Sequence, residues 1–433
     1  MFLKRNNILK IKLSILTAIY LSYIFGFFLR ENIAGGAEKD FINLTWVGIL
    51  SFKDNFLETI FNYGAIGEGS TPMFHIINAY LNPFTYSQYA FQASITLLSI
   101  LNVIFFSQLI KDKFKLSNID SYLYSSIFLL LPFYRSSAFW GLTENLGWLF
   151  LILSIKFYLD VDKQIPTKLK SKIFLTCLFS SLALYTRPYL IFFPIFILLN
   201  LIVKKQYSLL KYWISFFSLF AIPGLILLYI WGGSVYLGVG EEKINFIQEY
   251  HQPKFILKNL VIFASIFFFY FAPFHIINYS KKFKLPSRQK IKIFSLILLL
   301  LLLLNYFNTF DYLNYNKLGG GAFLKINQII FNENLIFFLF ISYLGIISII
   351  NFLEKSKNNF VLLFSVLLIY CTPRYIYQEY FEPLFIILFF TLFNLGRGVD
   401  KLIKKDQTIL IFIIFYVGYY FSSLYYRYYV TAI

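Results

Sequence analysis

The feature that most constrains this chain is a succession of apolar runs, each long enough to cross a lipid bilayer. A helix needs about 20 predominantly apolar residues to span the hydrocarbon layer. Hydrophobic side chains make up 58% of the 433 residues, and charged side chains only 14%. These proportions exclude a soluble globular domain and predict an all-α, polytopic transmembrane helical bundle.

The apolar runs predict about 13 transmembrane helices, within a range of roughly 11 to 14. The expected spans lie near residues 13–29, 86–110, 121–139, 143–159, 173–187, 188–203, 212–232, 256–280, 291–308, 334–353, 359–376, 381–396 and 408–426. Basic residues precede the first run, as in a secretory signal, but no small-residue cleavage site follows it, so a retained first helix is expected. No soluble domain is expected, and residues 1–433 are predicted to form one integral-membrane domain.

The net charge of +18 is explained by membrane topology rather than by nucleic-acid binding. If the N-terminus is cytoplasmic, most Lys and Arg residues fall in the inner connections, and most acidic residues fall in or near the outer segments. This is the positive-inside pattern of membrane proteins. It predicts a cytoplasmic N-terminus and no nucleic-acid partner. A composition rich in Ile, Lys, Asn and Phe favours a bacterial inner (plasma) membrane.

The longest predicted outer connection is the first, residues 30–85, called the first connection below. Within it, residues 52–61 alternate apolar and polar faces with helical periodicity, which is typical of a helix lying in the membrane interface. Residues 233–255 and 309–333 form two further long outer connections. The second of these contains Gly319-Gly320-Gly321, a run expected to flex over a site.

Charged and polar clusters beside the apolar runs are the candidate functional residues, because a charge near lipid is costly unless it has a partner or a task. These clusters are Glu38-Lys39-Asp40, Thr143-Glu144-Asn145, Thr186-Arg187-Pro188 and Pro373-Arg374-Tyr375. All four are predicted to lie on the outer face of the membrane.

With these clusters, a first helix, the run Gly35-Gly36-Ala37-Glu38-Lys39-Asp40-Phe41, a long first connection and many later spans, the chain resembles the GT-C superfamily of integral-membrane glycosyltransferases. The likeness covers most of the chain as architecture. It implies an enzyme of cell-envelope glycan biosynthesis that uses a polyprenyl-phosphate-linked sugar donor, as mannosyltransferases and arabinosyltransferases of this superfamily do. The acceptor is a glycan, a lipid or a protein on the extracytoplasmic face.

Glycosyl transfer from a lipid phosphate needs a base for the acceptor hydroxyl and a cation for the departing phosphate. The resemblance implies Asp40 as the base, with Glu38 contacting substrate hydroxyls or, together with Asp40, a divalent metal such as Mg or Mn. Arg374 is the candidate for the phosphate, because a guanidinium makes bidentate contacts to phosphate oxygens. The expected site is an outward-facing cavity bounded by the first connection.

Five further residues are expected to contact substrate, and three of them have a structural alternative. They are Arg187, Glu144, Glu68, Tyr375 and His75. Arg187 alternatively snorkels to the interface, Glu144 pairs with a nearby arginine such as Arg135, and the glycines beside Glu68 suit a turn. Arg374 itself is equally explained by an ion pair with Glu379 or Glu382, and the cluster around Asp40 by a solvated turn.

Two features argue against other site chemistries. Three histidines in the whole chain do not favour a histidine-rich metal centre. The two cysteines, Cys177 and Cys371, lie in or beside apolar runs without metal-ligand spacing or a disulfide framework, so core packing is expected for both.

Other functions remain open at this point. An O-antigen-type polysaccharide polymerase or ligase has a similar number of spans, but its large loops usually come late, whereas the first connection is the longest here. A lipid-linked glycan transporter or flippase is expected to place polar residues in the middle of its spans and to contain repeated halves. A structural scaffold is expected to tolerate changes of Asp40 or Arg374.

Overall fold

The computed structural model describes residues 5–63, 71–162, 169–231, 256–279, 288–306, 319–332, 334–373 and 375–430. Within these residues the secondary structure is helical and contains no strand, as predicted. The described chain divides into two compact units, and the prediction of one integral-membrane domain stays a prediction. The first unit comprises Met1–Phe246 and Phe412–Ile433, and the second comprises Ile247–Ile411.

The first unit begins with the long helix α1 (Arg5–Phe28) and a series of short helices. The short helices are α2 (Ala37–Asp40), the π-helical turn η1 (Phe41–Thr45), α3 (Trp46–Asp54), α4 (Phe56–Phe61) and α5 (Met73–Leu81). They occupy the first connection, which is therefore largely helical.

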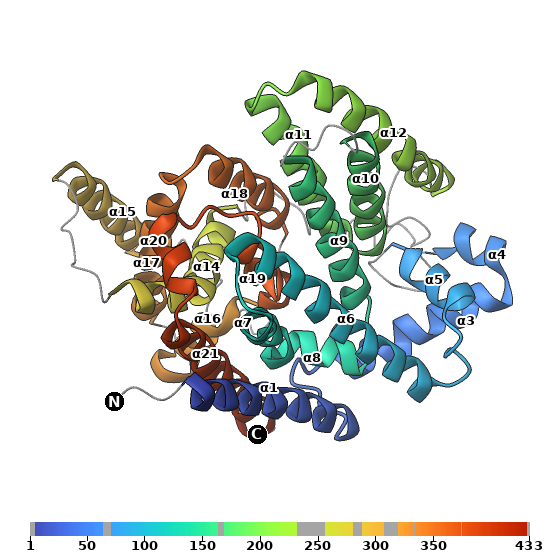
Figure 1. Cartoon of the computed structure of the whole chain (residues 1–433), viewed down its shortest axis with the longest axis horizontal. Coiled ribbons are helices and arrows are strands. Elements are labelled where there is room, and N and C mark those ends of the chain that lie inside the picture. Colours follow the sequence, from blue (N-terminus) through green and yellow to red (C-terminus); the bar gives the residue numbers. More distant parts are fainter. Residues whose placement is uncertain are drawn as a thin grey trace. The chain divides into compact units, whose positions relative to one another are not determined.

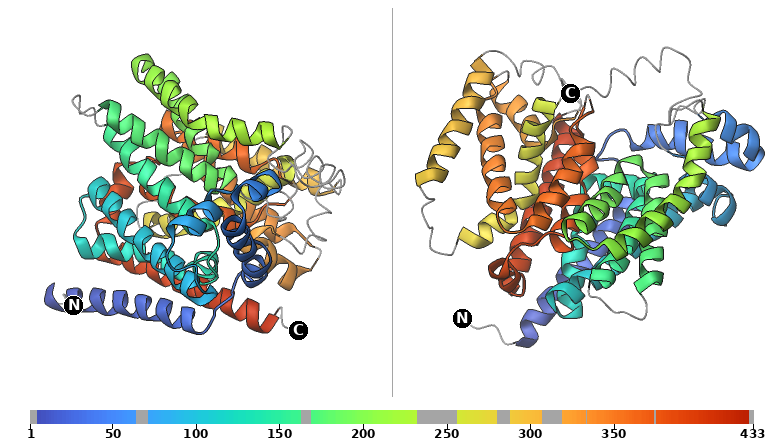
Figure 2. Two further views of the ribbon diagram at one scale, coloured as in Figure 1. Left: turned by 90° about the vertical axis from the view of Figure 1, so that its right-hand side faces the viewer. Right: turned by 90° about the horizontal axis from the view of Figure 1, so that it is seen from above.

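The remaining elements of the first unit follow (Figures 1 and 2). They are α6 (Gln88–Phe114), α7 (Asn118–Ser125), the 3-10 turn η3 (Ser126–Leu130), α8 (Pro132–Phe139), α9 (Glu144–Asp162), α10 (Leu169–Thr186), the 3-10 turn η5 (Pro188–Ile191), α11 (Phe192–Val203) and α12 (Tyr207–Ile230). The end of α21 (Asp406–Tyr425) and the π-helical turn η9 (Tyr426–Val430) complete the unit.

Helices α9 and α10 form an antiparallel pair that is joined by ion pairs at both ends (Figure 1). Lys172 Nζ lies 2.9 Å from Asp160 Oδ2 at one end, and Arg187 Nη2 lies 3.0 Å from Glu144 Oε1 at the other. The first two residues belong to a predicted inner connection and the last two to the predicted outer side. The pairing is therefore compatible with the alternation expected from the charge pattern.

The second unit is built around α14 and α17, which pack with their backbones in close approach. Its elements are α14 (Ile256–Tyr279), α15 (Arg288–Tyr306), α16 (Gly321–Phe331), α17 (Ile336–Leu353), α18 (Lys357–Tyr370), the 3-10 turn η8 (Gln378–Phe381), α19 (Leu384–Phe390), α20 (Arg397–Ile403) and the start of α21. A Cβ atom at Gly345 of α17 would lie 2.0 Å from the Ala264 carbonyl oxygen of α14. Small residues of this kind let membrane helices approach closely.

Seven helices within the described residues are long and apolar enough to cross a membrane. They are Asn7–Phe28, Gln88–Phe114, Tyr207–Ile230, Ile256–Ile277, Gln289–Tyr306, Ile336–Leu353 and Asp406–Val430. The number rises to eight if α8 and α9, which meet at an angle of 114°, are counted as one broken span. The chain is a multi-pass helical membrane protein, and the larger count of about 13 is not confirmed.

Several predicted spans differ from the helices in the structure. The run 121–139 is divided into α7, η3 and α8, and α8 is separated from η3 because Leu131 has an extended backbone before Pro132. Helices α11, α18 and α19 contain 12, 14 and 7 residues. At about 1.5 Å per residue these are shorter than the bilayer is thick. All residues of α19 are buried, so the apolar run 381–396 forms protein core and not a lipid-facing span.

The predicted interfacial helix over residues 52–61 is two short helices instead of one. Asn55 has an extended backbone between α3 and α4, and its side chain accepts a hydrogen bond of 3.2 Å from the Glu58 N–H. This is an N-cap, which starts a new helix at Phe56.

The predicted apolar face of residues 52–61 is divided between protein core and open surface. Phe52 and Ile60 are buried against Trp231, whose Nε1 donates to the Ile60 carbonyl at 2.7 Å. Leu57 and Phe61 are exposed. The buried apolar side chains therefore stabilise the protein core, and only the exposed ones are available to lipid.

The other two predicted outer connections are described only in part. Residues 233–255 lie outside the described residues. Of residues 309–333, the structure describes 319–332, which hold Gly319, Gly320 and helix α16.

Candidate functional site

The acidic cluster of the first connection lies at an exposed helix start. Glu38 and Asp40 belong to α2, which continues through η1 into α3, and both side chains are exposed. Residues two apart in a helix point about 200° apart. The two carboxylates therefore do not fit a shared divalent cation. Among the described residues, no group of three His, Cys, Asp or Glu side chains is placed to hold a metal.

A basic residue from the C-terminal end of the chain lies beside Gly35, just before this cluster. Gly35 has a φ of +83°, and a Cβ atom there would lie 3.2 Å from Arg427 Cζ. At the next residue, a Cβ on Gly36 would lie 3.6 Å from Asp40 Oδ2. Gly35 thus leaves room for the Arg427 guanidinium, and Gly36 leaves room for the Asp40 carboxylate. Arg427 was not among the predicted residues, because nothing in the chain order places the last helix beside the first connection.

Two of the predicted clusters meet at the junction of α9 and α10. The Arg187 guanidinium contacts Glu144 Oε1 at 3.0 Å, donates from Nη1 to Thr143 Oγ1 at 2.8 Å and donates from Nε to Tyr189 Oη at 2.8 Å. The side chains of Arg187 and Glu144 are 17% and 22% exposed. The result is an oriented, partly open ion pair, the explanation that sequence analysis offered for Glu144 but with a different arginine.

Arg135, the arginine expected beside Glu144, pairs with Glu31 instead. Its Nε and Nη2 atoms lie 2.6 and 2.7 Å from the two carboxylate oxygens. Neither Glu31 nor this pairing was predicted, because the partners are 104 residues apart in the chain.

Helix α8 joins the first connection to the start of α9. Ser136 Oγ accepts a hydrogen bond of 3.1 Å from the Ala34 N–H. Ser137 Oγ accepts one of 3.0 Å from Asn145 Nδ2. Because these serines are adjacent, the segment leading to Asp40 and the cluster containing Arg187 are both anchored on one short helix.

His75 is a core residue of the first unit. It is fully buried, its Nδ1 lies 2.9 Å from the Tyr63 hydroxyl, and its ring packs against Gly48. A Cβ atom at Gly48 would lie 2.5 Å from His75 Cδ2, so the contact between α3 and α5 depends on that glycine. The structure thus gives no exposed histidine face for the predicted substrate contact.

The remaining predicted residues belong to other segments. Glu68 and Arg374 lie outside the described residues. In the second unit, the Tyr375 ring lies 5.5 Å from Lys258 Nζ, a cation–π distance. The suggested partner Glu382 is buried and accepts a hydrogen bond of 3.1 Å from the Tyr270 hydroxyl.

The glycine run of the second unit is packed against a neighbouring segment. The Gly320 N–H donates to the Ile376 carbonyl at 2.7 Å, and a Cβ atom at Gly319 would lie 2.5 Å from the same oxygen. The Ala322 N–H donates to Gln378 Oε1 at 2.6 Å. These contacts hold the run in place, in contrast to the flexible hinge expected from its composition.

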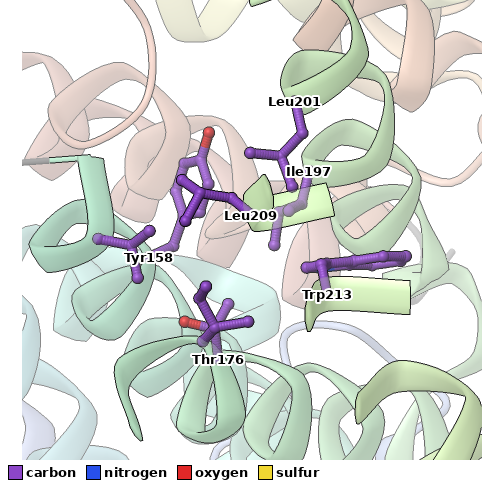
Figure 3. Close-up of a pocket in the computed structure, with 8 residues that line it drawn as sticks. Tyr158, Thr176, Ile197, Leu201, Leu209 and Trp213 are labelled. Carbon is purple, nitrogen blue, oxygen red and sulfur yellow. The ribbon is translucent and has the colours of Figure 1, made fainter. Parts of the chain in front are cut away.

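Figure 3 shows a small hollow in the first unit. Its lining residues place it at the end of α9 and α10 opposite Arg187. It is lined by Tyr158, Val161, Ile173, Thr176, Ile197, Leu201, Leu209 and Trp213. The Thr176 hydroxyl donates to the Lys172 carbonyl, and the Tyr158 hydroxyl accepts from Asn200 Nδ2. Since the lining is apolar and these hydroxyls are engaged, the hollow does not suit a sugar or a phosphate.

A comparison with protein-family models, with curated proteins and with solved structures finds no match to this chain. The likeness to GT-C glycosyltransferases therefore stays a prediction that rests on the residues quoted for it. The case for a function is carried by the site geometry and by the membrane character of the chain.

Proposed function

We propose that this protein is an integral-membrane glycosyltransferase that moves a sugar from a polyprenyl-phosphate-linked donor to a glycan, lipid or protein acceptor on the extracytoplasmic face. The observation that supports it most is the arrangement around α8, which anchors both the segment before Asp40 and the partly open Arg187–Glu144 pair. Carboxylate and guanidinium groups are the chemical requirements of this reaction. Apolar helices beside them offer a surface for an isoprenoid chain.

The proposed roles follow from the chemistry of each group. Asp40 takes the proton of the acceptor hydroxyl as it attacks the anomeric carbon, and Glu38 binds sugar hydroxyls. Arg187 holds the phosphate that leaves, because its contacts to Thr143 and Glu144 orient the guanidinium fork. Arg374, outside the described residues, is assigned to the same phosphate from its sequence neighbourhood. No step is assigned to a metal.

The proposed orientation places the N-terminus in the cytoplasm of a bacterium and the site outside its inner membrane. Contacts in the first unit support the alternation on which this rests, because they join segments expected on the same side. Lys12 Nζ lies 2.6 Å from Asp120 Oδ1, and both belong to the predicted inner half. Glu31 and Arg135 join two segments of the predicted outer half.

The decisive experiment measures sugar transfer by purified protein in lipid from a panel of polyprenyl-phosphate donors. Asp40→Asn is expected to reduce turnover by about 100-fold or more while donor binding is retained, because only the base is lost. Asp54→Asn is the matched control, an exposed carboxylate of the same connection with no assigned role. Turnover at the wild-type rate in Asp40→Asn would show that Asp40 is not the base. Donor binding without transfer across the panel would favour a flippase or a polymerase.

The same assay separates two roles of Arg187. If it binds phosphate, Arg187→Gln and Arg374→Ala weaken donor binding about tenfold, whereas Glu144→Gln, which leaves the guanidinium in place, has a smaller effect. If Arg187 only joins α9 to α10, Arg187→Gln and Glu144→Gln lower thermal stability alike and leave donor affinity unchanged.

A further inference from the structure

Arg135 is a completely buried charge with hydrogen bonds from all three nitrogens of its guanidinium group. Nε and Nη2 contact the two oxygens of Glu31. Nη1 donates to the Leu129 carbonyl at 2.8 Å, and Nη2 donates to the Ser22 carbonyl at 3.0 Å. The Tyr420 hydroxyl donates to Glu31 Oε2 at 2.8 Å. One side chain thus connects α1, α8 and α21.

The surroundings of Arg135 are shaped to receive it. A Cβ atom at Gly26 of α1 would lie 2.4 Å from Arg135 Nη2. The rings of Tyr23, Phe139 and Tyr420 lie 5.4, 5.3 and 4.5 Å from the guanidinium carbon. A buried ion pair is a weak source of stability, because removing two charges from water costs about as much as their attraction returns. The arrangement is better explained as a set of contacts that fixes the position of the neighbouring backbone.

The geometry that it specifies is that of the segment just before the acidic cluster. The Trp140 indole donates to the Glu31 carbonyl at 3.2 Å, and the Ala34 N–H donates to Ser136 Oγ. From the other side, the Tyr428 hydroxyl accepts from the Asn32 N–H at 3.3 Å. Residues 31–35 are therefore held between α8 and the C-terminal helix up to the start of α2.

We infer that Arg135 is a positioning residue: through Glu31 and Tyr420 it sets the direction of α2 and so the placement of Glu38 and Asp40, which makes the C-terminal helix a part of the site. As far as catalysis is concerned, the inference rests on the proposed glycosyltransferase function. Its geometric part is independent of that function. A guanidinium is required, because an ammonium cannot reach both carboxylate oxygens and two carbonyls in one plane.

The geometric test uses pulsed electron paramagnetic resonance between spin labels at Glu38→Cys and Lys111→Cys, both exposed sites of the first unit, in a background with Cys177→Ala and Cys371→Ala. The native chain is expected to give one narrow distance distribution. Arg135→Lys and Tyr420→Phe are expected to broaden it. Tyr420→Phe removes a single hydroxyl and keeps the ion pair, so it remains informative if Arg135→Lys does not fold.

The matched control is Asp160→Asn, which removes the ion pair to Lys172 at the other end of the unit and is expected to leave the distribution narrow. An unchanged distribution in both Tyr420→Phe and Arg135→Lys overturns the inference. Equal broadening by Asp160→Asn also overturns it, since the effect would then be general loosening of the unit.

The catalytic test compares kcat with KM for the donor. In Tyr420→Phe, kcat is expected to fall about tenfold with donor KM changed less than twofold, because a displaced base slows the chemical step while Arg187 still holds the donor phosphate. Broadened distances with unchanged kcat overturn the positioning role. Broadened distances in a protein that transfers no sugar in any variant support the geometric role of Arg135 and count against the proposed function alone.

Discussion

At the scale of single residues, glycines determine where the charged and aromatic side chains of the first unit lie. Gly26 leaves the space that the Arg135 guanidinium fills, and Gly48 leaves the space for the His75 ring. Both glycines lie inside helices, where alanine has the higher helix propensity. Space for a neighbour therefore outweighs local preference at these positions.

Gly26→Ala is expected to destabilise the protein although it favours the helix. The gain in helix propensity is about 1 kcal/mol at most, whereas forcing the new methyl against Arg135 costs about 1–3 kcal/mol. The measurement is the midpoint of thermal unfolding in detergent micelles. Gly418→Ala in α21 is the control, because a Cβ there meets nothing within 4 Å, and its midpoint is expected to stay or rise. Equal midpoints for the two variants would contradict the expectation.

At the scale of elements, apolar sequence does not distinguish a lipid-facing helix from a buried one. Helix α19 has seven residues, all buried, and Phe385 packs against Phe263 and Phe267 of α14. Helix α18 exposes Phe364 instead. Both segments appear in the sequence as apolar runs, yet only one of them has surface available to lipid.

Truncating a phenylalanine is expected to destabilise the protein at a buried position and to have little effect at a lipid-facing one. Phe385→Ala opens a cavity in the core and is expected to cost about 3–5 kcal/mol of the free energy of unfolding. Phe364 is exposed, so Phe364→Ala opens no cavity in the core. We expect the free energy of unfolding to fall by less than about 1 kcal/mol. Reversible denaturation in mixed micelles measures both values. Similar losses would indicate that 381–396 faces lipid after all.

At the scale of the whole molecule, the contacts of the first unit agree with the predicted inner and outer sides of the membrane. Within the first unit, segments predicted on the same side meet in ion pairs at both ends of α9 and α10. The native cysteines, Cys177 and Cys371, are both buried and are therefore suitable as a silent background for labelling.

Single cysteines are expected to report opposite sides of the membrane. In intact cells, a membrane-impermeant maleimide is expected to label Tyr86→Cys, a 78% exposed position directly after the first connection, and not Lys204→Cys, in a predicted inner connection. After permeabilisation both are expected to react, and the unmodified chain is expected to stay unlabelled. The reverse pattern in intact cells would place the N-terminus and the first connection on the other sides.

The helical fold was predictable from the sequence, and two of the selected residues meet in space, but their contact was not predictable. Glu144 and Arg187 were both selected, and their contact requires α9 and α10 to be antiparallel neighbours. The contact of Arg135 with Tyr420 joins residues 285 positions apart, for which periodicity and spacing carry no signal. The placement of Glu68 and Arg374 stays a prediction.

The sequence by itself determined that this is a helical membrane protein, because each apolar run must satisfy its backbone hydrogen bonds internally when water is absent. The distribution of basic residues also carries the predicted sidedness. Only the tertiary structure decided which apolar runs are buried and which charges pair, such as Arg135 with Glu31. Burial and ion pairing depend on neighbours from distant parts of the chain, and local sequence does not specify those neighbours.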